Sequence, residues 1–252
     1  TIFGLVKYDI PMTCSREVLG GCAPITVGGR RGVFELPSLP PWGVKENDPL
    51  HMPLVPPRRA ATWKRGEEPI FWGNPIQYPK GISEVHLALM TFEVPIEEAH
   101  SAANEIYRGF SPWLALFETY VEIIAKQNIT IDTGITREVD CLELLSWNED
   151  GKSVRPYDDS VIEPITILLS ENDDFLKPDQ FSLVCKLCSE LKTPAIEYRI
   201  MLEAYRALRV DDHRKVIIES AAVAELVLTK IIQAELTKSG ITFAGGLLKK
   251  FR

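Results

Sequence analysis

Short runs of apolar, β-branched and aromatic residues dominate the first half of the chain and predict strands. Residues 1–10 form one such run, and two more flank Gly28 and Gly29. The two glycines predict a hairpin, because glycine readily adopts the positive φ angles of a two-residue turn. Residues 82–94 alternate with both faces largely apolar, which is typical of an inner strand. We also expect strands at residues 128–132, 138–147 and 161–169.

Apolar residues at three- and four-residue steps predict helices in two regions. In the first region, Pro95 opens one helix, and Ser111 and Pro112 cap a second at residues 113–127, which makes a helix pair. Beyond residue 175 the pattern is helical only. We expect helices at residues 178–191, 195–208 and 213–236, the last of them capped by Asp211 and Asp212.

The helix expected at residues 213–236 is apolar around nearly its whole circumference. Such a helix is typically buried inside a bundle. Glu225 follows a run of small residues, at which a neighbouring helix can come close. A buried carboxylate needs a basic partner or a shifted pKa. The nearest arginines along the chain are Arg199, Arg206, Arg209 and Arg214.

Together these patterns predict an α+β protein in two parts. A β-rich N-terminal part with a helix pair is expected at residues 1–172, followed by an all-helical bundle at residues 173–252 that looks incomplete at its C-terminal end. Seven prolines within residues 37–57 exclude a helix and a central strand there. We expect this segment to be an extended strap over the sheet that buries Trp42 or Leu54. A polyproline ligand for a partner domain is the alternative.

Composition narrows the cellular setting. The 252 residues include no apolar run long enough for a membrane helix and no recognisable signal peptide, so we expect a cytoplasmic protein without a membrane partner. Five cysteines suggest no disulfide framework. The net charge is −7, with a balance of +4 over residues 1–65 and −11 over the remainder. The acidic helical half is poorly suited to binding nucleic acid through phosphate neutralisation.

Motifs for metal or cofactor chemistry are missing from the sequence. Cys185 and Cys188 would share one face of a helix, but zinc needs a second pair of ligands, so we expect buried structural thiols. The histidines have no ligand-type spacing, and no phosphate-binding glycine loop is present. We therefore expect neither a metal nor a cofactor. The four histidines are His51, His86, His100 and His213.

A basic cluster lies at one helix junction. Arg206, Arg209 and His213 flank the acidic turn between two predicted helices. An Arg–His pair can cleave RNA, with histidine as the acid or base and arginine stabilising the phosphorane charge. Arginine and histidine at such spacings are also expected by chance in a chain of this composition.

Residues 201–230 resemble the helix pair of HEPN-type domains, in which a short acidic turn leads into a buried helix with small residues and an acid. The earlier Trp113-Leu-Ala-Leu-Phe117 is similar to the front half of uncharacterised bacterial proteins that end in such helices. The resemblance implies antiviral defence or toxin function, action on RNA, or partner binding, with two copies pairing through the bundle. In that family the Arg-x(4–6)-His motif follows the buried helix. Here Arg206 and His213 precede it, and Ala207 replaces a usually polar residue.

Three functional hypotheses follow. The first is a defence-type protein whose HEPN-like part acts on RNA. The second is a non-catalytic interaction protein in which the same helices form a homo-oligomer. The third is a small-ligand binder with a pocket under the strap, near Trp42, Trp63 and Trp72. For the first hypothesis the candidate catalytic residues are Arg206, Arg209, His213 and Glu225.

Overall fold

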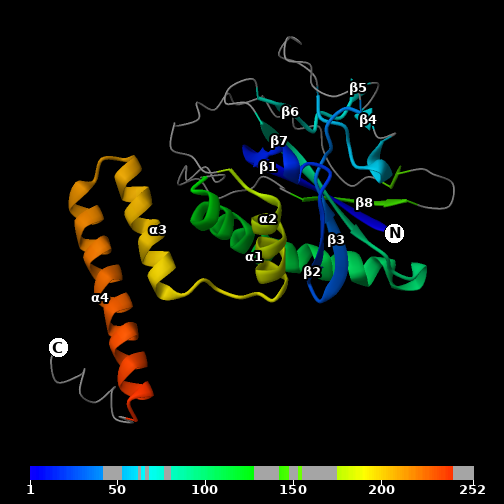
Figure 1. Cartoon of the computed structure of the whole chain (residues 1–252). Coiled ribbons are helices and arrows are strands. Elements are labelled where there is room, and N and C mark those ends of the chain that lie inside the picture. Colours follow the sequence, from blue (N-terminus) through cyan, green and yellow to red (C-terminus); the bar gives the residue numbers. More distant parts are fainter. Residues whose placement is uncertain are drawn as a thin grey trace. The chain divides into compact units, whose positions relative to one another are not determined.

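The computed structural model describes residues 1–41, 53–61, 64–65, 68–76, 81–127, 142–147, 153–154 and 175–240. The chain divides into two compact units, Thr1–Lys192 and Thr193–Arg252 (Figure 1). The first unit is α+β, and the described part of the second is a pair of helices. Within these ranges, no helix combines the length and apolar character needed to cross a membrane.

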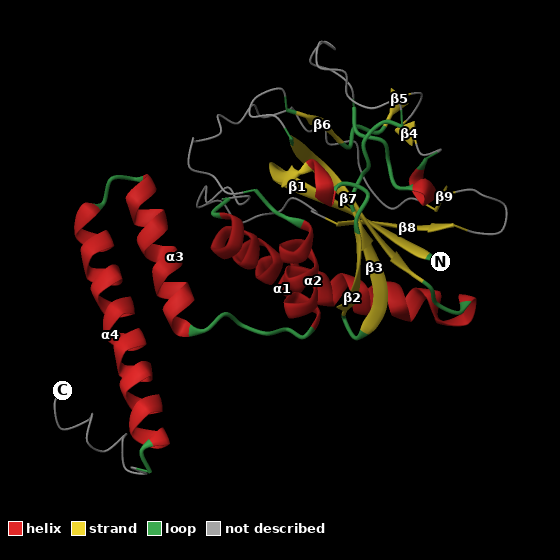
Figure 2. Ribbon diagram, viewed as in Figure 1, coloured by secondary structure: helices red, strands yellow, loops and turns green. Residues whose placement is uncertain are grey.

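A seven-stranded antiparallel sheet forms the frame of the first unit (Figure 2). Its strand order is β2-β3-β7-β1-β8-β9, and β6 pairs with β7. The strands are β1 (Ile2–Ser15), β2 (Cys22–Val27), β3 (Arg30–Glu35), β6 (Gly73–Pro75), β7 (Ile82–Phe92), β8 (Leu142–Trp147) and β9 (Ser153–Val154), and a separate ribbon joins β4 (Lys64–Arg65) to β5 (Glu68–Pro69). The predicted strands near 1–10 and 138–147 correspond to β1 and β8. Those at 128–132 and 161–169 lie outside the described residues.

The predicted hairpin at Gly28 and Gly29 is confirmed as the β2–β3 turn. Val27 pairs with Arg30, so two residues make the turn, and their φ angles are 58° and 81°. Positive φ at both central positions gives a turn whose twist matches that of the flanking strands.

The predicted inner strand is also confirmed, because β7 lies between β3 and β1. On one face, the Phe34 ring meets the rings of Trp113 and Phe117 edge-on, with centroids 5.5 Å apart in each case. Side chains alternate along a strand, so Leu5 and Leu89, which pair with each other, point to the opposite face. Both are buried, so the two faces of the sheet are covered.

One long helix, α1 (Ala99–Ala125), replaces the predicted helix pair. Pro112 lies inside it, although an interior proline removes one backbone hydrogen bond and usually kinks or ends a helix. Apolar side chains before and after the proline belong to one buried stripe. Because Ile106 and Phe117 are both fully buried in the core, tertiary packing across the break outweighs the local cost of the proline.

The end of α1 is fixed by Lys126, which adopts a left-handed conformation with φ of 50°. The next side chain, Gln127, bonds the backbone of β1. The Thr13 N–H donates to Gln127 Oε1 over 2.9 Å, and Gln127 Nε2 donates to the Thr13 carbonyl over 2.6 Å. The side-chain amide of Gln127 thereby makes the two hydrogen bonds to Thr13 that a neighbouring strand would otherwise make.

Helix α2 (Pro178–Ser189) belongs to the first unit, so the observed division falls after Lys192 rather than at residue 172 as we expected. Just before the helix, the Ser15 N–H donates to the Leu176 carbonyl over 3.0 Å. At its far end, the Thr26 N–H donates to Ser189 Oγ over 2.9 Å. These bonds attach α2 to β1 and β2. The change to a purely helical pattern therefore does not mark the boundary between the units.

The two described ends of the proline-rich segment pair with each other. Ser38 and Val55 exchange backbone hydrogen bonds of 2.8 Å in each direction, so the two described ends of the segment lie side by side and antiparallel. Leu54 is buried in the core, as predicted, and its N–H donates to the Gly73 carbonyl over 2.7 Å. Trp42 lies outside the described residues.

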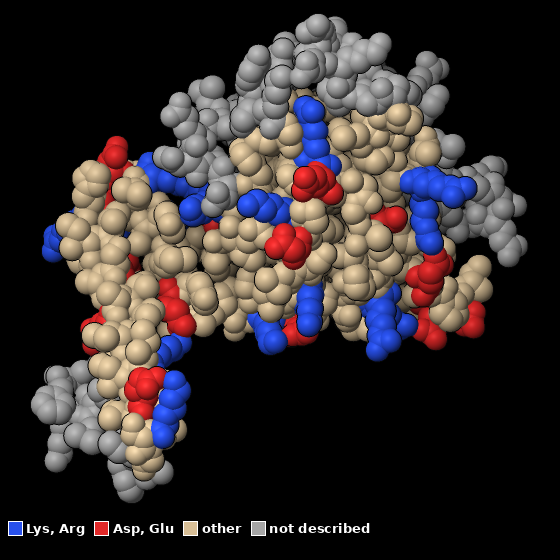
Figure 3. Space-filling model, in the orientation of Figure 1, with Lys and Arg blue, Asp and Glu red and all other residues tan. Residues whose placement is uncertain are grey.

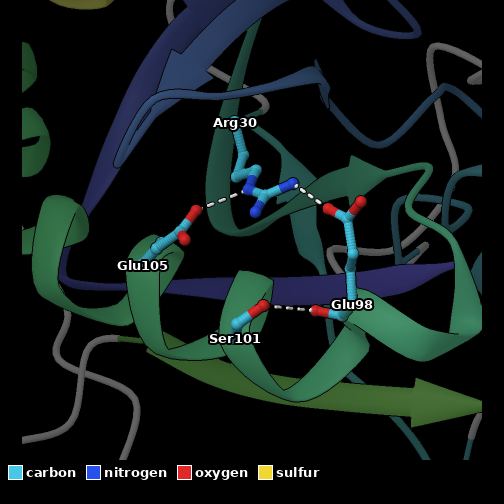
Figure 4. Close-up of polar contacts among 4 residues, drawn as sticks. All are labelled: Arg30, Glu98, Ser101 and Glu105. Carbon is cyan, nitrogen blue, oxygen red and sulfur yellow. Dashed lines mark hydrogen bonds and ion pairs between the residues drawn. The ribbon is translucent and has the colours of Figure 1, made fainter.

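An ion-pair cluster fastens the β2–β3 hairpin to the start of α1 (Figure 4). Arg30 Nη1 donates to Glu98 over 2.7 Å, and Arg30 Nε donates to Glu105 over 2.5 Å. The hydrogen bond from Arg30 is the main reason that the pKa of Glu105 lies below its ordinary value. Ser101 Oγ donates to the Glu98 carbonyl over 3.0 Å, within the first turn of the helix.

Candidate functional site

The second unit is a helical hairpin of α3 (Ile196–Arg209) and α4 (His213–Lys238), close to the two helices predicted at 195–208 and 213–236. Asp211 turns the chain between them with φ of 58°. Asp212 then caps α4 as predicted, because its carboxylate accepts a 3.0 Å hydrogen bond from the Lys215 N–H.

Ion pairs join the two helices of the hairpin. Lys215 Nζ lies 2.9 Å from Glu203, and Lys230 Nζ lies 2.5 Å from Glu197 near the other end. The hydrogen bond from Lys215 lowers the pKa of Glu203, and the same contact raises the pKa of Lys215. These pairs fix α3 antiparallel to α4.

The predicted burial of α4 is wrong for the described residues. No residue of α4 is buried, and Glu225 is exposed. An apolar circumference requires neighbours on several sides, whereas within the described part of the second unit α4 packs against one helix, α3. The periodicity identified the apolar sides of the helix correctly, but it could not say how many of them another element covers.

The predicted catalytic residues do not form one site. Arg206, Arg209 and His213 lie at the α3–α4 junction, where all three are exposed and Arg206 Nη1 bonds Glu203 over 2.9 Å. Glu225 lies twelve residues beyond His213 on the same helix, which corresponds to about 18 Å along the axis. A glutamate at that distance cannot orient a group at the junction.

The main feature of the hairpin is exposed apolar surface. Eleven of the seventeen large apolar side chains that are exposed within the described residues belong to this unit. Figure 3 shows uncharged surface between the acidic and basic side chains on the visible face of the hairpin. The eleven are Ile196, Tyr198, Tyr205, Leu208, Val210, Ile217, Ile218, Val227, Leu228, Ile231 and Ile232.

Five residues of α4 form what we call the outward stripe: Ile217, Ala221, Ala224, Leu228 and Ile231. All five are exposed. They follow one another at steps of four, three, four and three residues, the spacing of a coiled-coil seam. This spacing is visible in the sequence. It was missed there because the whole helix was interpreted as core.

The cysteine pair on α2 is buried, as predicted. Cys185 and Cys188 are free thiols and fully buried, and Cys14 of β1 is too. Burial raises the pKa of all three thiols, because it disfavours the thiolate. Since the thiolate is the reactive form, these cysteines are structural.

The remaining candidates provide no chemical site in the part of the chain that the structure describes. His86 lies half-buried in β7, where desolvation lowers its pKa. Of the three tryptophans expected near a ligand pocket, Trp72 is fully buried, and Trp42 and Trp63 lie outside the described residues. No group of three or more His, Cys, Asp or Glu side chains in the described ranges could hold a metal ion.

Comparisons of the chain with protein-family models, curated proteins and solved structures find no match.

Proposed function

We propose that this chain is a non-catalytic interaction protein of the cytoplasm, in which the α3–α4 hairpin is the binding element. The observation that carries the proposal is the concentration of exposed large apolar side chains on the hairpin. Soluble monomers rarely expose extended apolar patches, and those they expose commonly mark binding sites. The free thiols Cys14, Cys185 and Cys188 are consistent with a reducing compartment.

The free energy of burying apolar surface favours a partner that covers the hairpin. Its buried residues are Leu202, Ala204 and Ala207, all on α3. Burying an exposed leucine or isoleucine is worth roughly 1.5–3 kcal/mol. Ile217, Leu228 and Ile231 are each more than half exposed, so covering them with a partner stabilises the hairpin by several kcal/mol.

Cleavage of RNA is the second candidate, favoured by the position of Arg206, Arg209 and His213 at one junction. In this proposal His213 moves the proton and the arginines stabilise the phosphate charge. Glu225 takes no part, because it lies too far along α4. The double variant Arg206→Ala/His213→Ala tests it: RNA cleavage by the wild type that this variant abolishes would establish the activity.

The binding proposal can be tested with a photo-crosslinking amino acid placed at Leu228 in the full chain within cells. We expect ultraviolet light to join this position to a polypeptide. Tyr107 of α1 is the matched control, because its exposure of 56% is close to the 58% of Leu228.

Three outcomes separate the candidates. Polypeptide products at Leu228 that exceed those at Tyr107 support the interaction proposal. Products that contain RNA instead of protein support the second candidate. Equal yields at both positions, without a distinct product, would refute binding through the hairpin.

A further inference from the structure

Two opposite sides of α4 have different surroundings. The side toward α3 carries Lys215 and Glu219 together with Ala222 and Leu226, all only partly exposed. Successive residues of an α-helix are about 100° apart. The outward stripe therefore lies roughly 170° from this side and falls within an arc of about 80°. One helix thus has a seam that α3 covers and a second seam that α3 leaves open.

The outward stripe has the chemistry of a helix–helix contact. Ile217, Leu228 and Ile231 are 69%, 58% and 56% exposed, and no charged residue belongs to the stripe. Ala221 and Ala224 lie in the middle, where small side chains let a facing helix come close. The heptad spacing matches a partner helix with the same period.

The residues that continue the heptad at either end carry opposite charges. Arg214 precedes Ile217 by three residues, and Glu235 follows Ile231 by four. If two α4 helices lie antiparallel with their stripes overlapping, Arg214 of each lies within about one turn, roughly 5 Å, of Glu235 on the other. A parallel pair would instead bring like charges together at both ends.

We propose that the outward stripe pairs antiparallel with the outward stripe of a second copy of this chain. Two α4 helices then form the centre of a four-helix assembly with α3 on the outside. The contact is self-complementary, as a two-fold interface requires. The positions beside the stripe carry one charge only, Glu225, so they offer little charge pattern with which to select a different protein. This inference rests on the proposed function and names its partner.

Sedimentation equilibrium of the full chain tests the pairing. We expect a species of twice 28.3 kDa. Leu228→Glu places a charge in the stripe of both copies and should weaken the dimer about thirtyfold or more. Tyr198→Glu on α3, where the side chain is 51% exposed, is the control and should leave the dimer unchanged. Circular dichroism verifies that each variant keeps its helices.

Charge reversal tests the orientation. Arg214→Glu and Glu235→Arg should each weaken the dimer about fivefold, since each variant reverses both symmetry-related surface ion pairs, which together contribute about 1 kcal/mol. The double variant restores opposite charges across the antiparallel contact and should return to wild-type affinity. Single reversals without effect would overturn the antiparallel arrangement.

Sedimentation and crosslinking together distinguish a failure of self-pairing from a failure of binding through the hairpin. A wild-type chain that stays monomeric, or a Leu228→Glu dimer as tight as wild type, overturns self-pairing. If photo-crosslinks at Leu228 still join another polypeptide in that case, the binding proposal stands with a different partner.

Discussion

Two glycines determine how closely the β2–β3 hairpin approaches α1. Gly28 in the turn and Gly109 in the helix lie against each other's backbones, and a Cβ atom on Gly28 would meet the Glu105 carbonyl. Gly29, the neighbouring turn residue, has positive φ as well but has open space around its Cα. Both turn glycines therefore need positive φ, but only Gly28 also lacks room for a side chain.

This difference leads to the first prediction. Gly29→Ala should cost about 1–2 kcal/mol, the penalty of a left-handed conformation. Gly28→Ala should cost about 1–3 kcal/mol more, because the added methyl group also overpacks the contact with α1. Urea unfolding of both variants measures the gap. Equal losses would show that the approach of the helix does not constrain Gly28.

Arg30 governs the titration of Glu105. The pKa of Glu105 is lowered mainly by the hydrogen bond from Arg30. A carboxylate with a depressed pKa stabilises the fold above its unfolded-state pKa of about 4.3, and this contribution is lost as the pH falls through its folded-state pKa.

We therefore predict that Arg30→Ala raises the pKa of Glu105 toward its ordinary value, as measured by NMR titration. Stability below pH 4 should change less than stability at neutral pH. The control is Arg31→Ala, which alters the adjacent, exposed arginine. A Glu105 pKa that stays low in Arg30→Ala would assign the shift to another group.

At the scale of elements, α1 continues through a residue that should interrupt it. Pro112 is exposed, whereas Phe110 and Trp113 beside it are buried. The proline thus contributes nothing to the core and lies on the solvent side. Its backbone nitrogen cannot bond the carbonyl four residues earlier.

Pro112→Ala should consequently stabilise the first unit. Alanine is about 3 kcal/mol better than proline inside a helix, and the greater freedom of the unfolded chain offsets up to about 1 kcal/mol of that. We expect a gain of about 2–3 kcal/mol in thermal or urea unfolding. Ser111→Ala, an exposed neighbour, should change stability by less than about 0.5 kcal/mol. A loss of stability in Pro112→Ala would indicate that the proline shapes α1 for packing.

At the scale of the whole molecule, the first unit buries far more apolar surface than the described part of the second. Almost all fully buried side chains of the described residues lie in the first unit, where Phe34, Trp113 and Phe117 form one aromatic cluster. In the hairpin, ion pairs and caps hold two helices whose apolar sides remain largely open. The two units should therefore unfold separately.

Phe117→Ala tests this independence. Removing a fully buried aromatic ring should destabilise the first unit by about 3–5 kcal/mol. Amide hydrogen exchange should then quicken throughout β1, β7 and α1, while exchange in α3 and α4 stays as in the wild type. Faster exchange in the hairpin as well would show that both units unfold together.

Local patterns in the sequence were sufficient for most elements. The alternation of residues 82–94 predicted β7, Gly28 and Gly29 predicted the hairpin turn, and Asp212 predicted the start of α4. Each of these depends on a few neighbouring residues, whose backbone preferences and caps act over one turn or one strand. The candidate site was predictable only in part: the sequence placed Arg206 and His213 at a helix junction, but it could not show that they are exposed.

Tertiary packing decided what local patterns could not. Pro112 stays inside α1 because buried side chains on both sides hold the helix against the sheet. Helix α2 joins the first unit through bonds to β1 and β2 that lie far apart in sequence. The apolar circumference of α4 was evident in the sequence, but the number of its neighbours was not. Periodicity shows which sides of a helix favour burial, whereas only the arrangement of the other elements determines which sides are covered.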